Sequence, residues 1–236
     1  MKIFITGSTQ GIGRAMAKAF VERGDEVTVH CSSDLEKAKR VAAEIGAAHA
    51  VVADLSVAEE VNSLYSKTGP VDCLILNASV QYRTPWLEIE DYELDRQIDI
   101  NFKSTLKLMQ AYYPEMKEKG FGRIITVGSV QQYKPHRDMP VYAATKCAIM
   151  SLVTNISKQV APYGVTVNNI APGVIATPRN ADALADAEYA KKVMEGIPAG
   201  YAGEDYDCAG AALLLCSEAG RYITGTDIIV DGGMHL

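Results

Sequence analysis

The sequence predicts an α/β protein, a doubly wound parallel sheet of about seven strands with helices on both faces, in a single domain over residues 1–236. Two features lead to this fold class. Short runs rich in β-branched residues alternate with longer helical patterns, and several runs are apolar throughout, as in strands covered on both faces. Hydrophobic residues make up 48% of the chain, enough to bury a large core. The expected strands are 2–6, 26–31, 49–54, 72–77, 123–128, 166–171 and 227–231, and the expected helices are 11–23, 34–45, 57–67, 88–118, 141–162 and 204–217.

One segment, residues 173–203, interrupts this alternation. Pro172, Pro178 and Pro198 lie in or beside it, together with several glycines and a helical pattern near 181–195. Such an excursion between a strand and the next helix is typical of a substrate lid above the sheet.

Composition excludes several classes of function. The net charge is −6 and no run of Lys and Arg stands out, which argues against a nucleic-acid surface. No signal peptide and no apolar run long enough to span a bilayer is visible. The five cysteines are scattered without a C-x-x-C and the four histidines have no ligand spacing, so we expect reduced thiols, a cytoplasmic location and no metal site.

A glycine-rich turn, "TGSTQGIG" at 6–13, joins the first expected strand to the first expected helix. Gly7 permits a tight turn, Gly11 lets the backbone approach a ligand, and Gly13 allows the helix to pack close to the sheet. The free N–H groups at the helix start suit a pyrophosphate. The alternative is a glycine-rich turn that binds nothing, because such motifs carry false positives.

The end of the second strand bears on cofactor choice. An acid there binds the ribose of NAD, but this chain has Cys31, followed by Ser32 and Ser33. Without a carboxylate a 2′-phosphate is not repelled, so we expect NADP to be preferred over NAD, with Arg14 and Lys37 as candidate phosphate partners. The alternative role of the serines is to cap the next helix.

Tyr142 and Lys146 lie four residues apart on one expected helix, so their side chains share a face. A free tyrosine has a pKa of about 10, and a nearby cation lowers it by favouring the phenolate. The pair therefore predicts a general acid/base, although the stretch alone is more typical of an ordinary surface helix. Ser129 and Asn77 follow two strands, where ligands bind in parallel sheets.

Seven motifs together resemble the short-chain dehydrogenase/reductase family, in order and in spacing. The resemblance covers essentially the whole chain and implies a Rossmann fold, hydride transfer between a nicotinamide and a carbonyl or secondary alcohol, and a homotetramer with helices 99–118 and 141–162 at its interfaces. The motifs are TGxxxGIG at 6–13, Asp54 in "ADLS", "NAS" at 77–79, Asn101 in "DINFKS", Ser129, Tyr142-x-x-x-Lys146 and "NNIAPGVIATP" at 168–178, with "ITGTDIIVDGG" at 223–233 similar to the family's C-terminal end.

The resemblance also implies roles. Tyr142 would be the acid/base, Lys146 would lower its pKa and bind the nicotinamide ribose, Ser129 would polarise the carbonyl, and Asn101 would hold a proton-relaying water. Cofactor contacts would come from Gly7, Ser8, Gln10, Gly11, Ile12, Gly13, Cys31, Ser32, Ser33, Asp54, Leu55, Asn77, Ala78, Tyr142, Lys146, Pro172, Gly173, Ile175 and Thr177, and substrate contacts from Ser129, Gln131 and Tyr142.

Two positions depart from the family pattern. Ser79 stands where many members have Gly, which adds a Cβ near the cofactor. Gln10 stands where many NADP-using members carry Arg or Lys, and this argues against NADP.

Polar residues in two loops point to a small polar substrate such as a sugar, sugar acid or polyol. Three alternatives stay open: these side chains face solvent; "GRIITVGSV" marks a 3-oxoacyl-[acyl-carrier-protein] reductase; or the fold senses a redox cofactor without turnover, which the presence of all four catalytic residues disfavours. The polar loop residues are Gln81, Arg83, Gln131, Gln132 and His136, and Arg179 on the expected lid could close over an anionic group.

Overall fold

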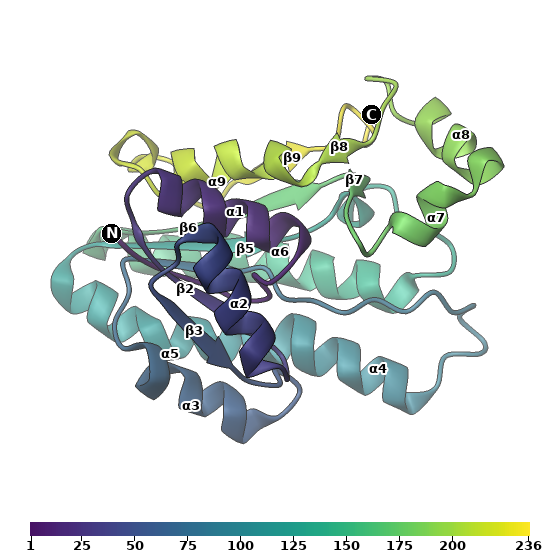
Figure 1. Cartoon of the computed structure of the whole chain (residues 1–236). Helices are drawn as coiled ribbons and strands as arrows, with labels where there is room; N and C mark the ends of the chain where they lie inside the picture. The colour runs from purple at the N-terminus through teal and green to yellow at the C-terminus, as the bar shows by residue number, and fades with distance from the viewer.

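The computed structural model describes residues 1–236, except the side chains of Asp182 and Ala183. Seven parallel strands form one sheet in the order β3-β2-β1-β4-β5-β6-β9 (Figure 1), and all seven predicted strands are confirmed. β7 and β8 form a separate two-stranded parallel sheet. The strands are β1 (Lys2–Ile5), β2 (Glu26–Cys31), β3 (His49–Val52), β4 (Cys73–Leu76), β5 (Gly122–Val127), β6 (Val165–Pro172), β7 (Ile175–Ala176), β8 (Gly203–Glu204) and β9 (Asp227–Val230).

Helices cover both faces of the large sheet, as predicted. The expected helical pattern near 181–195 is present as α7 and α8, which stand beside the sheet in Figure 1. The helices are α1 (Gly11–Glu22), α2 (Leu35–Ile45), α3 (Ala58–Thr68), α4 (Asp91–Gln97), α5 (Ser104–Lys119), α6 (Pro140–Val160), α7 (Ala181–Ala185), α8 (Ala187–Glu195) and α9 (Ala209–Leu215), with a π-helical turn η1 (Ile98–Lys103) and 3₁₀ turns η2 (Val130–Gln132), η3 (Ala161–Tyr163), η4 (Asp205–Cys208) and η5 (Glu218–Gly220).

Two apolar cores hold these layers together, one on each face of the sheet. On one face, α1, α2 and α9 bury side chains such as Phe20 and Leu215. On the other, α3, α5 and α6 bury side chains that include Leu64, Tyr112 and Val153. Because each strand supplies apolar side chains to both faces, its sequence is apolar without alternation, which is the pattern that predicted a parallel sheet.

The prediction of one continuous helix over residues 88–118 is wrong. The structure has α4 and α5 joined by the π-helical turn η1, centred on Asn101. The hydroxyls of Ser104 and Thr105 donate to the carbonyls of Ile100 and Asn101, 2.6 and 3.0 Å away, and so satisfy acceptors in this distorted stretch. Single π-helical turns within α-helices are frequent at functional sites.

The order of the strands fixes where a ligand can bind. The chain runs outward from β1 through β2 to β3, then returns to place β4 on the other side of β1. In open parallel sheets this reversal leaves a crevice at the carboxyl ends of the two central strands. The loops after β1 and β4, which begin at Thr6 and Asn77, therefore border the expected site.

His30, at the end of β2, fastens the first of these loops to its neighbours. Its Nδ1 accepts a hydrogen bond from the Gly7 amide at 3.0 Å, so Nε2 carries the proton and donates to the Ala53 carbonyl at 3.0 Å. The His30 backbone N–H donates to Ser8 Oγ at 2.9 Å. Burial lowers the pKa of His30 to about 4, opposed by the hydrogen bond to Ala53, so the ring is neutral at physiological pH.

This lowered pKa predicts a pH-dependent stability. Between about pH 4 and 6.5 the unfolded chain protonates His30 and the folded one does not, so the free energy of unfolding falls as the pH drops through that window. From pH 7.5 to pH 5 the loss from His30 is about 2 kcal/mol. In urea unfolding between pH 7.5 and pH 5, we expect the free energy of unfolding of His30→Gln to fall by about 2 kcal/mol less than that of wild type. The exposed His49→Gln is the control, and equal pH slopes in both variants would contradict the assignment.

Candidate active site

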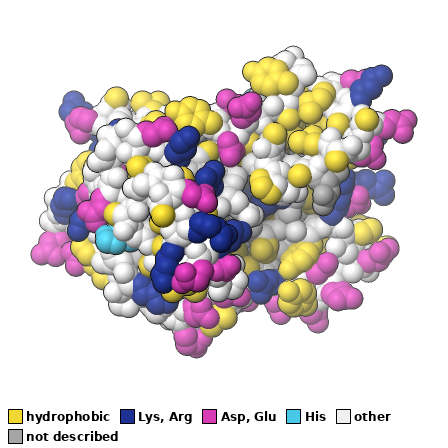
Figure 2. Space-filling model, in the orientation of Figure 1, with side chains coloured by type: hydrophobic (Ala, Val, Ile, Leu, Met, Phe, Trp, Pro, Cys, Tyr) yellow, Lys and Arg dark blue, Asp and Glu magenta, His cyan; other side chains and the backbone are white. Residues whose placement is uncertain are grey.

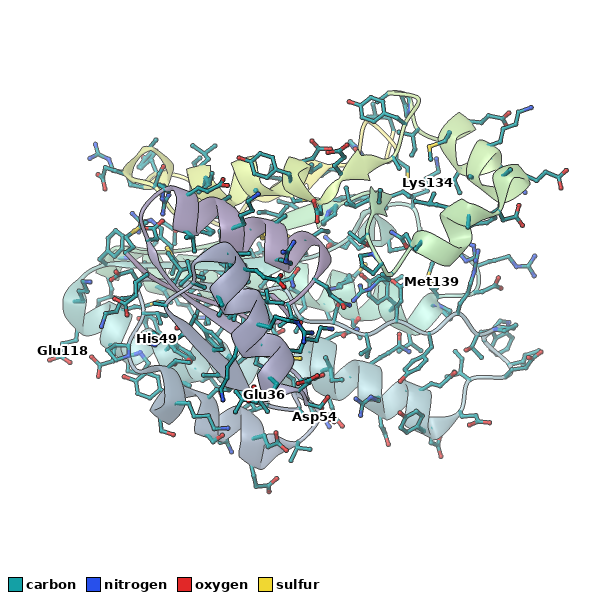
Figure 3. The ribbon with its side chains drawn as sticks, in the orientation of Figure 1. Glu36, His49, Asp54, Glu118, Lys134 and Met139 are labelled. Carbon is teal, nitrogen blue, oxygen red and sulfur yellow. The ribbon has the colours of Figure 1, made fainter. Side chains whose placement is uncertain are left out.

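A cavity of about 640 Å³ lies at the carboxyl ends of the central strands and contains most of the predicted site residues. Figure 3 labels two of its lining residues, Asp54 near the N-terminal end of α2 and Met139 below α7. The predicted residues that line it are Gly7, Gln10, Gly11, Ile12, Gly13, Cys31, Ser32, Asp54, Leu55, Asn77, Ala78, Ser129, Gln131, Tyr142, Pro172, Gly173, Ile175 and Thr177.

Four residues of the predicted catalytic and cofactor set do not line the cavity, and neither do the predicted polar loop residues Arg83 and Gln132. Ser8 is fully buried, and its hydroxyl donates to the Ile5 carbonyl at 2.8 Å, so its side chain supports the turn and does not face the cavity. Ser33 is exposed just before α2. Asn101 and Lys146 are buried behind the cavity wall. The Ser8 and Ser33 side chains thus lie off the cavity, and the expected cofactor contacts of these two residues and of Lys146 stay predictions.

Lys146 lies next to Tyr142 on α6, as the spacing of the pair predicts. Its Nζ is 5.4 Å from the centroid of the Tyr142 ring and donates to the Val127 carbonyl at 2.7 Å. Burial alone would raise the pKa of Tyr142, but the charges of Lys146 and Arg179 and hydrogen bonds from Ser129 and Ser79 outweigh it, and the pKa lies below its ordinary value. The phenol is thus tuned toward proton exchange near neutral pH.

Ser129 is oriented by its own loop. Its backbone N–H donates to Gln132 Oε1 at 2.9 Å, and its Oγ accepts from the Gln131 amide at 3.2 Å. The oxygen accepts from the Gln131 amide while the hydroxyl keeps its own proton, which it directs toward the Tyr142 phenol, and this lowers the pKa of Tyr142. The Ser129 side chain can therefore donate to an oxygen beside Tyr142.

Asn101 supports the loop after β4. Its Oδ1 accepts from the Val80 amide at 2.9 Å, and its Nδ2 donates to the Val80 carbonyl at 2.9 Å and to Thr145 Oγ1 at 3.2 Å. The side chain is thus fully engaged in joining η1, the β4 loop and α6. Its expected role in holding a water stays a prediction.

The phosphate loop offers a close approach and free donors. A Cβ at Gly13 would lie 2.4 Å from Asn77 Nδ2 and 2.5 Å from the Gly7 carbonyl oxygen, so only glycine fits there. The same Asn77 amide donates to the Thr6 and Gly7 carbonyls at 3.0 Å. Gln10, at the start of α1, caps none of the helix N–H groups with its side chain. These amides are left for an anion, which fits a pyrophosphate.

The adenosine end of the cavity carries a cation near Cys31. Burial raises the pKa of the Cys31 thiol, but hydrogen bonds from the Asp34 and Ser33 amides, the Thr9 hydroxyl and the Lys37 charge lower it overall. Amides and an ammonium group therefore converge where a 2′-phosphate would lie.

The two candidate cations for that phosphate differ in their surroundings. Lys37 lines the cavity and donates to Gln10 Oε1 at 3.3 Å. Arg14 does not line it and pairs with Glu44 at 3.1 Å. Asp54 accepts from the Ser56 amide at 2.9 Å and lies 3.6 Å from Arg96.

Sequence reasoning missed two kinds of residue at this cavity. His30 reaches it from the end of an apolar strand, where a single histidine in "VTVHC" gives no signal of its own. Met139 and Met234 line it from distant parts of the chain, which only the folded structure brings together.

The residues that the structure describes contain neither a metal-ligand cluster nor a membrane-spanning helix. Among them, no three His, Cys, Asp or Glu side chains are grouped so as to hold a metal ion. Within the same residues, every helix is too short or too polar to cross a membrane.

Comparison with known proteins agrees with this geometry. Residues 7–235 match the profile of a family described as enoyl-(acyl carrier protein) reductase. The chain is 36% identical over 243 residues to 3beta-hydroxysteroid dehydrogenase 1 of Eggerthella lenta, covering 99% of this chain and 93% of that protein. It is 33% identical over 240 residues to the 3-oxoacyl-[acyl-carrier-protein] reductase FabG of Staphylococcus aureus, covering 98% and 97%.

A solved structure from Beutenbergia cavernae is also similar. It is provisionally assigned as an NAD(P)-dependent gluconate 5-dehydrogenase and holds NADP at low occupancy; its TM-score is 0.93, its identity 33%, and the alignment covers 99% of this chain and 96% of that one. The predicted cofactor class, fold and enzyme class all agree with these relatives. The chain belongs to the short-chain dehydrogenase/reductase family of NAD(P)-dependent oxidoreductases.

Proposed function

We propose that this enzyme interconverts a carbonyl and a secondary alcohol on a small polar, sugar- or polyol-like substrate with NADP. The observation that carries the proposal is the Tyr142 hydroxyl at the cavity wall, between the charge of Lys146 and the hydroxyl of Ser129. Among the relatives, the Beutenbergia cavernae structure is assigned to a sugar acid and holds NADP, which supports both the substrate class and the cofactor.

In the reductive direction a bound nicotinamide would supply the hydride to the carbonyl carbon. Ser129 donates a hydrogen bond to the carbonyl oxygen and stabilises the negative charge that develops on it. Tyr142 then transfers its phenolic proton to that oxygen, which completes the alcohol. Lys146 stabilises the resulting phenolate, and the reverse order of steps oxidises the alcohol.

The polar side chains near Tyr142 support a polar substrate. Gln131 lines the cavity and its Oε1 accepts from the His136 amide at 2.6 Å, so its NH₂ group is left as a donor. Gln81 and Tyr189 line the same space. An apolar substrate would leave these groups unpaired, whereas hydroxyls or a carboxylate would satisfy them.

A second candidate is reduction of a 3-oxoacyl thioester, favoured by the similarity to the Staphylococcus aureus reductase. Turnover of polyols, sugar acids, 3-oxoacyl thioesters and steroids with both cofactors separates the two. A rate on the thioester orders of magnitude above every sugar-like compound would replace the first proposal with the second.

The organisation of the enzyme is proposed on the same resemblance. Residues 1–236 would form one domain in which 173–203 acts as a substrate lid. The protein would act in the cytoplasm as a homotetramer with α5 and α6 at its interfaces, without nucleic acid or membrane partners. Size-exclusion chromatography with light scattering measures the oligomeric state directly.

Tyr142→Phe should abolish turnover and leave cofactor binding intact. The ring keeps its packing but loses the proton donor, and loss of a general acid/base costs at least ~100-fold in kcat. The measurements are steady-state turnover and NADPH fluorescence titration. Near-normal turnover in this variant would show that another group carries the proton.

Lys37→Ala should weaken discrimination in favour of NADPH. Loss of a charged hydrogen bond to the 2′-phosphate lowers kcat/KM for NADPH by about tenfold. NADH lacks that phosphate, so its kcat/KM stays within a small factor of the wild-type value. Arg14→Ala, which removes a cation outside the cavity, is the matched control. If the NADPH-to-NADH ratio were unchanged in Lys37→Ala, or favoured NADH in wild type, the proposed cofactor preference would be wrong.

A further inference from the structure

Arg179, in the turn between β7 and α7, crosses the cavity to the loop after β4. Its Nη1 donates to Ser79 Oγ at 3.1 Å and its Nη2 donates to the Ser79 carbonyl at 2.6 Å. Both residues line the cavity together with Tyr142. Two donors of one guanidinium are thus held on a single residue in the cavity that Tyr142 also lines.

The partners of Arg179 are neutral. Among the side chains that the structure describes, all but those of Asp182 and Ala183, no carboxylate lies within ion-pair distance of its guanidinium. A hydroxyl and a carbonyl oxygen accept its hydrogen bonds without balancing its charge. A bidentate carboxylate does both and is the stronger partner of a planar guanidinium.

The charge of the cavity favours an anion as well. Its described lining has four cationic side chains, Lys37, Arg96, Arg179 and Lys192, but one carboxylate, Asp54, which Arg96 already pairs. The whole protein has a net charge of −6, so this positive lining is local to the cavity. Figure 2 shows Lys and Arg side chains near the hollowed centre of the view, between α2 and α4. Lys37 lies at the adenosine end, which leaves Arg179 and Lys192 for the substrate end.

We infer that Arg179 and Ser79 form a subsite for the carboxylate of a hydroxy acid or oxo acid substrate, so that the enzyme selects sugar acids over neutral polyols. The inference rests on the proposed function and narrows it. Arg179 and Ser79 line the same cavity as Tyr142, and the Arg179 charge lowers the pKa of the phenol, so a carboxylate at Arg179 would lie in the cavity that holds the reacting carbon.

A cofactor phosphate is the other anion that could reach Arg179, because the residue follows Thr177 and Pro178. A Cβ at Gly11 of the phosphate loop would lie 3.2 Å from Thr177 Cγ2, so this turn runs beside the phosphate loop. Ser79, however, leaves β4 on the Tyr142 side, and its side chain lies close enough to the phenol to lower the pKa of Tyr142. The contacts with Ser79 therefore favour the substrate end.

The test measures oxidation by NADP⁺ of two substrates, an aldonate and the polyol of the same carbon chain, which lacks the carboxylate. Both substrates are assayed with wild type and with Arg179→Gln. We expect kcat/KM for the aldonate to fall about 100-fold and that for the polyol to fall much less, because the polyol loses only the effect of the Arg179 charge on the pKa of Tyr142, with an unchanged KM for NADP⁺. Ser79→Gly should also lower the aldonate value. Arg137→Gln, whose side chain is 89% exposed, removes a guanidinium outside the cavity and is the matched control.

Binding gives a readout that needs no turnover. Aldonate binding to the enzyme–NADPH complex, followed by cofactor fluorescence, should be about 100-fold weaker in Arg179→Gln. Three results would each overturn the carboxylate subsite. They are an equal loss of kcat/KM for the aldonate and the polyol, a loss of affinity confined to NADP⁺, and no aldonate binding by wild type. Failure of the proposed function is a separate result, namely no carbonyl or alcohol turnover by wild type, or normal turnover in Tyr142→Phe. Thermal unfolding of each variant checks that it is folded.

Discussion

The buried ammonium group of Lys146 is the constraint around which the site is arranged. Burial of a cation is unfavourable and lowers its pKa, so the charge needs close partners. The Val127 carbonyl at the end of β5 is one, 2.7 Å away, and the Tyr142 phenol on the same helix face is the other. The end of β5 and the beginning of α6 must therefore stay in register, and this register also brings Ser129 to the phenol.

The loops around this pair are held in place by polar side chains that form hydrogen bonds with backbone N–H and C=O groups. His30 and Asn77 fix the Gly7 turn, and Asn101 fixes the loop after β4 through both polar groups of Val80. Each joins segments far apart in the sequence at the carboxyl edge of the sheet. Because these bonds form within the chain itself, the loops need not be ordered by a ligand, and binding free energy remains for positioning the reacting atoms.

The sequence allowed the sheet, its helices and most cavity residues to be predicted, because continuous apolar runs and motif order both depend on local residues. The helical pattern over 88–118 could not show the π-helical turn at Asn101, because a stretch of six residues is too short to establish a repeat of its own. Motif membership could not give side-chain direction, which is why Ser8 was expected to face a cofactor although it bonds Ile5. The contact of Arg179 with Ser79 joins residues far apart in the chain, and no spacing rule connects them.

Two cations act on Tyr142, but they respond differently to a substrate. Lys146 lies behind the cavity wall, so its charge acts on the phenol whether or not the cavity is filled. Arg179 lines the cavity, and a carboxylate bound to it would offset its charge and raise the pKa of Tyr142. A raised pKa strengthens the hold of the phenol on its proton, whereas a neutral substrate leaves the charge of Arg179 unbalanced and the pKa of Tyr142 lower. The charge of the substrate would thus shift the pKa of the group that reacts with it.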